Sequence, residues 1–254
     1  MRLRAAVFAA LLLAAPAHAA PSAYDLYVAG KFADAMKAGE ASNNALGFVT
    51  AARAALADAQ TRADPCLDCL KRAEDDARKA IALDNSIADA HVYLAVAMGY
   101  EARIVGPVWA RAHNYPGHAK DELDMALRLN PKDGWALAAL GGWNIEIVRT
   151  GGARLADWFY GASVDKGMAA FSAAFKNAPD NLSIRYQYAL SLSGFDADTY
   201  RKEIDDALAR VSRLKPATAY EITAKVRAAE LAALLKRNDR AAFDARVRHY
   251  QGYP

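Results

Sequence analysis

Residues 119–131 read AKDELDMALRLNP and contain the pattern that decides the fold. Ala119, Leu123 and Ala126 are separated by steps of 4 and 3 residues, and Pro131 follows five residues later. Residues with this spacing share one face of an α-helix, and proline cannot continue a helix. The stretch therefore predicts a helix that ends before Pro131 and uses small residues to approach a neighbouring helix closely.

The same steps recur in three other segments of the chain. These segments are Ala73, Ala77, Ala80 and Asn85; Gly167, Phe171, Ala174 and Pro179; and Ile204, Leu208, Val211 and Pro216. Ala or Gly occupies six of the eight first and third positions in the four segments. Alanine, at 61 of 254 residues, would fill about two of them by chance. The spacing is therefore an internal repeat.

This spacing resembles the second helix of the tetratricopeptide repeat (TPR), which has small, large or aromatic, small and proline residues at these relative positions. Residues 30–35 (GKFADA) resemble that family's turn into the second helix, and residues 126–131 (ALRLNP) resemble its end. Leu140-Gly141 resembles part of the first helix. The resemblance implies an all-α fold, a solenoid of antiparallel helix pairs that forms a superhelix and holds peptides or protein partners.

The sequence also departs from that family. The four segments end at residues 85, 131, 179 and 216, which lie 46, 48 and 37 residues apart, whereas the family repeat has about 34 residues. Two repeats therefore carry insertions of 12 and 14 residues. Ile204 and Val211 stand where small residues belong, so the last helix pair is expected to be wider.

Six helix pairs are expected. They are residues 22–29 with 31–42, 44–61 with 66–83, 87–104 with 118–129, 133–148 with 164–177, 181–193 with 199–213, and 217–236 with 239–250. No stretch rich in Pro, Gly or Ser divides them. We therefore expect one continuous helical repeat domain of residues 22–250, in which each pair is stabilised mainly by its neighbours.

Composition and charge exclude several classes of protein. The abundant alanine favours helices over strands. The 32 basic and 29 acidic residues are scattered along the chain, so no basic patch for nucleic acid is visible. The chain also lacks the composition of disordered, collagen-like, disulfide-framework or multi-span membrane proteins.

Residues 1–19 have the pattern of a secretory signal peptide. Arg2 and Arg4 precede an apolar run over residues 5–15, and Ala17-His18-Ala19 is a small-x-small cleavage site. We expect cleavage after Ala19, export across the inner membrane to the periplasm, and no stable membrane insertion of the mature protein. The alternative is an uncleaved anchor, although the run is shorter than the roughly 20 residues of a membrane-spanning helix.

Cys66-Leu67-Asp68-Cys69 is a CxxC motif. A thioredoxin-type site needs a preceding strand, covalent haem needs histidine at position 70, which is Leu70, and zinc needs further ligands that His91, His113 and His118 do not supply at paired spacing. Cysteines at this spacing at a helix start lie within disulfide range. We expect a disulfide between Cys66 and Cys69; a redox-active pair and a metal site are the alternatives.

No enzyme motif is present, since the chain lacks HExxH, GxSxG, a Walker loop and GxGxxG after a strand. Gly141-Gly142 and Gly151-Gly152 flank an expected helix without a phosphate-binding lysine. Asp75-Asp76 and Asp205-Asp206 point about 100° apart on their helices, so solvated faces are the simpler interpretation. His91 is interpreted as a partly buried, hydrogen-bonded residue. We expect no catalytic residue, metal or cofactor.

The two insertions, residues 105–117 and 149–162, are the candidate binding region. They are interpreted as loops that lie on the same edge of the solenoid, with Trp143 as a neighbour. Their ring-bearing residues are Trp109, His113, Tyr115, Trp158, Phe159 and Tyr160. Aromatic side chains often anchor interfaces, so they could form one aromatic lip. The alternative is that the rings fold back as local cores.

Two functions remain open from the sequence. The first is a non-catalytic scaffold that binds a protein or peptide partner of the cell envelope, as the TPR resemblance implies. The second is an enzyme or small-ligand carrier whose insertions, 105–117 and 149–162, form a pocket. A deep pocket with converging polar groups would favour the second function, and an open groove would favour the first.

Overall fold

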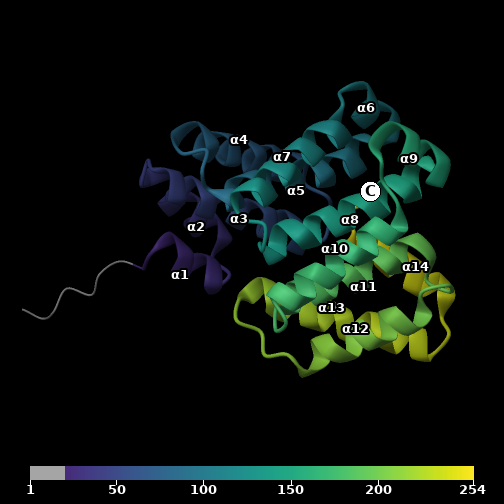
Figure 1. Cartoon of the computed structure of the whole chain (residues 1–254). Helices are drawn as coiled ribbons and strands as arrows, with labels where there is room; N and C mark the ends of the chain where they lie inside the picture. The colour runs from purple at the N-terminus through teal and green to yellow at the C-terminus, as the bar shows by residue number, and fades with distance from the viewer. Residues whose placement is uncertain (1–20) are drawn as a thin grey trace, which may run out of the picture.

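A computed structural model describes residues 21–254, which contain fourteen helices and no strand (Figure 1). The helices are α1 (Ala23–Val28), α2 (Phe32–Ala41), α3 (Ala45–Thr61), α4 (Leu67–Leu83), α5 (Ala88–Val105), α6 (Pro107–Ala112), α7 (Tyr115–Leu129), α8 (Gly134–Gly151), α9 (Ala153–Tyr160), α10 (Val164–Asn177), α11 (Leu182–Asp196), α12 (Arg201–Arg213), α13 (Ala219–Lys236) and α14 (Arg240–Tyr250). Neighbouring helices pack in pairs. The predicted all-α helix-pair solenoid is confirmed. The predicted signal peptide, residues 1–19, lies outside the described residues.

The six expected pairs correspond to twelve of these helices, and local capping explains several starts. The Asn44 side chain accepts a hydrogen bond from the Gly47 amide (2.9 Å) at the start of α3. Asp133 accepts from the amides of Trp135 (2.8 Å) and Ala136 (3.0 Å) at the start of α8. These bonds satisfy amides that have no partner within the helix.

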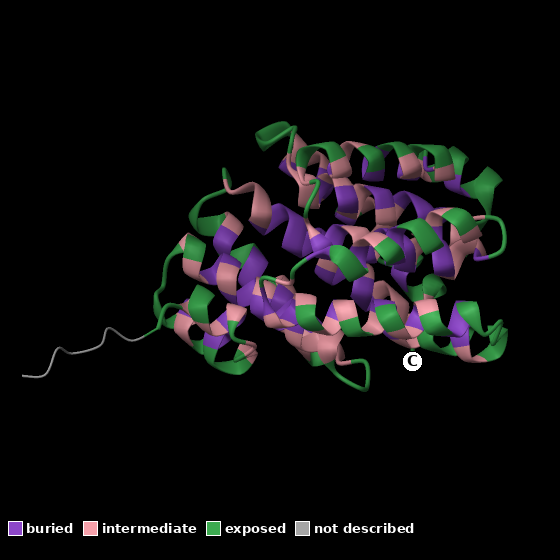
Figure 2. Cartoon of the chain, turned by 90° about the horizontal axis from the view of Figure 1, so that it is seen from below, coloured by how far each residue is buried: buried purple, intermediate pink, exposed green. Residues whose placement is uncertain are grey.

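The repeated 4-and-3 spacing marks faces where helices approach closely. Ala119, Leu123 and Ala126 of α7 are buried and pack toward α5. Between α8 and α10, a Cβ on Gly141 would lie 2.6 Å from the Phe171 ring. Small residues therefore set the helix separation, as the spacing predicts. Figure 2 shows buried residues on the inner faces of the helices and exposed residues on their outer faces.

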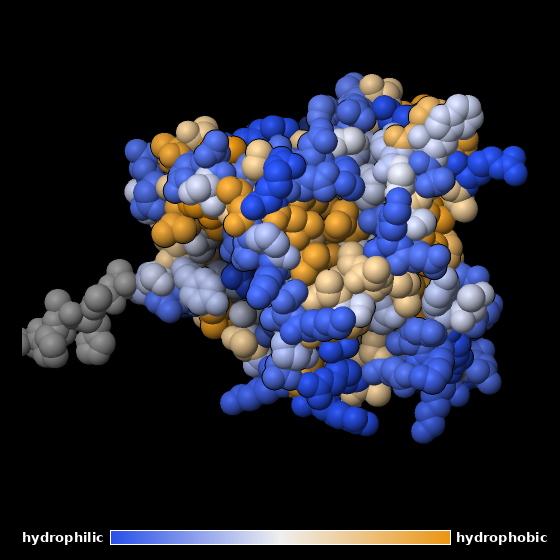
Figure 3. Space-filling view, viewed as in Figure 1, coloured by the Kyte–Doolittle hydropathy of each residue, from blue (hydrophilic) through white to orange (hydrophobic). Residues whose placement is uncertain are grey.

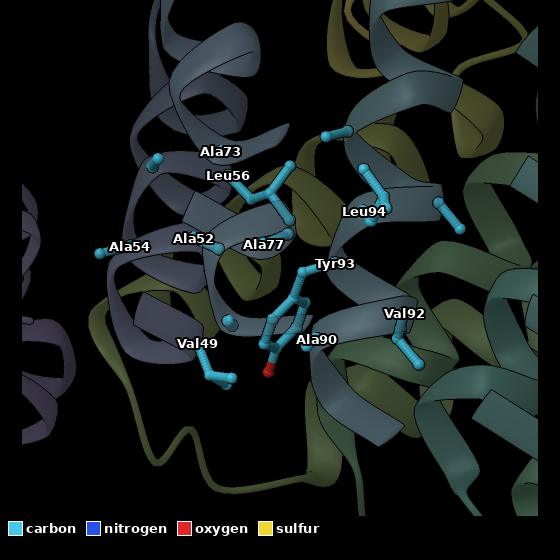
Figure 4. Close-up of a cluster of buried hydrophobic side chains, with 14 of the residues drawn as sticks. Val49, Ala52, Ala54, Leu56, Ala73, Ala77, Ala90, Val92, Tyr93 and Leu94 are labelled. Carbon is cyan, nitrogen blue, oxygen red and sulfur yellow. The ribbon is translucent and has the colours of Figure 1, made fainter. Parts of the chain in front are cut away.

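The first core cluster illustrates this packing. Figure 4 shows Leu56 and Tyr93 surrounded by small side chains, among them Ala52, Ala77 and Ala90. Tyr93 supplies volume where α3, α4 and α5 meet around alanines. Bulk is thus concentrated in a few large side chains, and most of the helix contacts are made by methyl groups.

The insertions are helical, which corrects their interpretation as loops. Gly106 (φ 86°) and Gly152 (φ 75°) turn the chain sharply, and α6 and α9 start at the next residue. Positive φ is easily adopted only by glycine. At the first turn Pro107 follows, a residue that suits the first position of a helix. Each insertion is therefore a glycine-hinged short helix.

The last helices fold back onto the first ones. Helix α13 packs against α1 and α3, and the side-chain oxygen of Gln60 in α3 accepts hydrogen bonds from Tyr220 (2.8 Å) and Tyr100 (3.0 Å). In addition, the Arg227 guanidinium donates to the Gln60 carbonyl (2.7 Å). These contacts tie the two ends of the solenoid together around its inner face.

Cys66 and Cys69 form the expected disulfide, with Cα atoms 5.3 Å apart. The Cys69 amide also donates to the Cys66 sulfur (3.2 Å) at the start of α4. The bond closes the first turn of that helix and spans only three residues.

Candidate binding groove

A groove with a volume of about 580 Å³ runs along the inner face of the solenoid. Its walls come mainly from α5 and α8, with smaller contributions from α3 and α7 and with α6 and α9 at one end. Gly99 of α5 and Gly142 of α8 both line it, and a Cβ on Gly99 would have no neighbour within 4 Å. The groove is therefore open partly because glycine leaves room in the middle of its walls.

Helices α6 and α9, together called the lip, lie next to each other at the groove (Figure 1). The Arg111 guanidinium of α6 stands 4.5 Å from the ring centre of Phe159 in α9. Trp109 of α6 stacks on His113, just after that helix, at 3.7 Å and meets Tyr115 of α7 edge-on at 5.4 Å. The structure thus brings the two insertions together through a cation–π contact.

The seven candidate residues divide into two groups. Tyr115, Trp143, Phe159 and Tyr160 line the groove, whereas Trp109, His113 and Trp158 do not. Trp143 and Tyr160 meet edge-on at 6.2 Å, and the Trp143 indole donates to the Pro116 carbonyl (3.0 Å). Some of the rings therefore pack toward the groove and others face solvent.

The lip exposes several large apolar side chains, some of which also line the groove. Val108 and Trp158 are 85% and 79% exposed, and Trp109, Leu155 and Phe159 are exposed as well. Figure 3 shows, on the face that it presents, hydrophobic side chains over the middle of the molecule, where α8 and α10 lie, and hydrophilic ones below and around it. Exposed apolar surface of this kind often marks an interaction site.

One end of the groove holds an ion-pair network, here called the Arg103 end. Arg103 faces Glu146 (3.6 Å), and Arg149 pairs with the same carboxylate (2.7 Å). Tyr253 donates its hydroxyl proton to Glu146, and Arg103 donates to the Gln251 carbonyl (2.9 Å). Burial alone would raise the pKa of Glu146, but the charges of Arg103 and Arg149 and these hydrogen bonds lower it to about 2.

The opposite end of the groove, here called the Arg53 end, is built differently. The Arg53 guanidinium lies 4.5 Å from the Tyr27 ring centre and 5.7 Å from that of Tyr24. Tyr27, Arg53 and Tyr93 line the groove there. Within residues 21–254, no carboxylate oxygen lies within 4.0 Å of the guanidinium nitrogens of Arg53. This cation is held by rings and not by an acid.

Two further ionisable groups lie inside the protein. His91 is buried, with Nδ1 2.6 Å from Glu122 and Nε2 3.0 Å from the Asn85 carbonyl, as the sequence interpretation expects. Glu101 accepts from the Tyr115 hydroxyl (3.2 Å), and burial, together with Glu74, raises its pKa to about 8. Both groups connect helices beside the groove.

The sequence does not identify three residues of the site as candidates: Arg53, Arg103 and Glu146. Arg149 lies three residues from Glu146 on α8, and Tyr100 three residues from Arg103 on α5. The other partners lie far away along the chain, so no local motif marks these sites. In the described part of the chain, no group of three or more His, Cys, Asp or Glu residues is arranged to hold a metal ion. None of the helices described has the length and apolar character needed to cross a bilayer.

Comparison with known protein families corrects the resemblance stated above. The model described as "RMD1-3: Regulator of microtubule dynamics protein 1-3" matches residues 31–236, and a comparison with curated proteins gives no match. The TPR assignment is therefore wrong, because the matching family is a different one. The 4-and-3 spacing reports close packing of helix pairs, which any solenoid of this kind requires. The matched range includes every groove residue except Tyr27 and Tyr253.

Proposed function

The chain belongs to the RMD1-3 family, and we propose that it is a non-catalytic binding protein whose groove holds an apolar segment of a protein or peptide partner. The family description names regulators of microtubule dynamics and no chemical reaction. The proposal for this chain rests on the groove and not on that description.

The observation that carries the proposal is an apolar groove of about 580 Å³ beside an exposed aromatic lip. Tyr93 and Arg103 line its two ends and lie ten residues apart on α5, which is about 15 Å of helix. A partner segment of about three helical turns has that length. Apolar helices recognised in grooves bind through rows of side chains on one face.

Filling the groove tests the proposal. Gly99→Phe places a ring where a Cβ meets no neighbour, so the fold should be retained, and Gly99→Ala is the matched control. A photo-crosslinking amino acid at Val96, inside the groove, should capture a partner from an envelope extract, whereas one at Val226, 64% exposed on α13, should not. Gly99→Phe should abolish the Val96 crosslink. A crosslink that survives Gly99→Phe would contradict the proposal.

The lip offers a separate test. We expect Trp109→Ala combined with Trp158→Ala to weaken partner capture while circular dichroism and melting temperature stay nearly unchanged, because neither ring is buried. A large loss of stability with capture retained would show that these rings are structural.

We also propose that the protein acts in the periplasm, on the basis of the signal-peptide pattern in residues 1–19. N-terminal sequencing of the exported protein should begin at Ala20. Finding Met1 intact on membrane-associated protein would refute both the cleavage and the location.

A second function is favoured by the size of the groove. A volume of about 580 Å³ falls within the range of small-molecule sites, about 300–1,000 Å³. The protein could then be a carrier of a small apolar ligand. Native mass spectrometry of protein purified from the periplasm distinguishes the two functions, since a carrier should retain an extra mass that Gly99→Phe removes.

A further inference from the structure

Arg53 occupies an unusual position in the groove. It is half-buried on α3, it lines the groove, and the Tyr24 and Tyr27 rings lie against its guanidinium. Tyr rings attract a cation by their faces, and the Tyr27 side chain also hydrogen-bonds the guanidinium, but neither ring supplies an anion for its N–H donors. An arginine has five such donors and stays charged.

Three other arginines beside the groove have oxygen partners. Arg103 and Arg227 donate to backbone carbonyls at 2.9 and 2.7 Å, and Arg149 donates to Glu146 at 2.7 Å. Arg53 has no carboxylate within 4.0 Å among residues 21–254. Arg111 of the lip also lines the groove over a ring and has no carboxylate within 4.0 Å in this described range, but it is exposed. A half-buried charged fork without an anion is therefore the feature that separates Arg53 from its neighbours.

Two acidic residues act on this end without forming an ion pair with Arg53. Asp133 is engaged at the start of α8, where it accepts from two backbone amides. Burial of Asp89 on α5 and the nearby charge of Asp133 raise its pKa, and the opposing effect of the Arg53 charge is smaller. Neither acid therefore takes the place of a partner for the guanidinium.

We propose that the Arg53 end binds an acidic group on the ligand, so that the groove selects an apolar segment carrying one anionic group, a carboxylate in a peptide. This inference rests on the proposed function of the groove. The anion meets the edge of the Arg53 guanidinium, and the apolar part of the ligand extends along α5 and α8 toward the lip. The ligand thus has a defined direction in the groove.

Two dyes with the same ring system provide the probes. 1-N-phenylnaphthylamine is neutral, and 8-anilino-1-naphthalenesulfonate carries a sulfonate that stands in for the carboxylate. Wild-type protein should bind both, and Gly99→Phe should weaken both. Arg53→Gln should weaken the sulfonate dye by about tenfold, the loss of a charge-assisted hydrogen bond, and the neutral dye by less than about twofold.

Three variants make the test specific. Arg111→Gln removes the same charge at the lip and should change sulfonate binding by less than about twofold. Arg53→Lys keeps the cation and should retain most of the binding. Should Arg53→Gln fail to fold, Asp89→Asn tests the same field with the opposite sign and should strengthen sulfonate binding by about twofold.

The outcomes separate the two proposals. Binding of neither dye, or binding that Gly99→Phe leaves unchanged, would overturn the proposed function of the groove. Binding of both dyes in the groove, with the sulfonate dye indifferent to Arg53→Gln, would overturn this inference alone. Equal losses in Arg53→Gln and Arg111→Gln would also overturn it, because the effect would then be that of net charge.

Discussion

The two ends of the groove each place an arginine over tyrosine rings, yet only one of them supplies an acid. Arg103 lies 4.7 Å from the Tyr100 ring centre and faces Glu146; Arg53 lies 4.5 Å from that of Tyr27 and has no carboxylate within 4.0 Å in residues 21–254. The Arg103 end joins α5, α8 and residues 251–253. Arg103, which holds these helices together, is neutralised by an acid of the same chain. Arg53 has no such acid among the described residues, and in our proposal a ligand supplies it.

The largest effect is expected from removing the acid at the Arg103 end. Glu146→Gln leaves Arg103, whose side chain is 17% exposed, without its counter-charge, and should lower the free energy of unfolding by about 2 to 3 kcal/mol. Urea denaturation followed by circular dichroism measures this change. Asp89→Asn is the control at the Arg53 end and should not destabilise. Equal losses of unfolding free energy in Glu146→Gln and Asp89→Asn would show that the two ends do not differ in this way.

Tyr253 should come next. Tyr253→Ala removes a ring that the guanidinium of Arg149 approaches to 4.7 Å and a hydroxyl that donates to Glu146, at a cost of about 1.5 to 2 kcal/mol. Tyr253→Phe keeps the ring and should lose about half of that. Thermal melts of the three proteins would show it. An unchanged melting temperature in Tyr253→Ala would show that residues 251–253 are not part of the network.

The pH dependence of stability should also separate the ends. Since the pKa of Glu146 is lowered to about 2, while an unfolded Glu titrates near about 4.3, the unfolded state takes up protons first as the pH falls. Glu146 therefore stabilises the fold above about pH 5 and loses this contribution toward pH 2, by about 1.5 to 2 kcal/mol at pH 3. For Asp89, whose pKa is raised, the sign is opposite, since protonating a buried acid favours the folded state.

Urea denaturation of wild type, Glu146→Gln and Asp89→Asn at pH 3, 5 and 7 checks both signs. The fall in stability between pH 5 and pH 3 should be shallower in Glu146→Gln and steeper in Asp89→Asn. Identical pH profiles for all three proteins would contradict the charge assignment at both ends.

The smallest effect is expected for Arg53→Gln. The loss of a cation–π contact should be offset by removal of a half-buried charge that has no acid beside it, and the net change should stay within about 0.5 kcal/mol. Chemical denaturation in parallel with Arg103→Gln measures it. A loss as large as that of Glu146→Gln would show that Arg53 is structural.

Much of the fold follows from local sequence, and much of the site does not. The spacing of Ala119, Leu123 and Ala126 predicts α7 and its packing face, because helical periodicity and small residues act within a few turns. The helical insertions were missed, although Gly106-Pro107 is a recognisable start of a helix. The repeat spacing marks residues 105–117 and 149–162 only as extra length between two expected helices. It therefore predicts loops unless the glycine and proline at the turn are considered.

The sequence marks the ring-bearing residues of the two insertions, but it does not show which of them line the groove and which face solvent. Trp143 and Tyr160 face the groove and Trp158 faces solvent because of how α8 and α9 pack, which is a tertiary property. The ends of the groove lie further beyond local patterns: Tyr27 and Arg53 are on different helices, and Tyr253 reaches Arg103 and Glu146 from the far end of the described chain. Such pairs are set only when the solenoid closes.

The placement of the tryptophans gives the molecule a built-in spectroscopic reporter. All four occur between residues 109 and 158; Trp135 and Trp143 line the groove, and Trp109 and Trp158 stand on the lip. Tryptophan emission, excited at wavelengths where tyrosine does not absorb, therefore arises entirely beside the groove. A ligand that enters should shift this emission without any label. In a denaturation experiment, the same signal will follow the loss of structure around α6 to α9 and, through Trp135, the loss of its packing against the core that α11–α14 share.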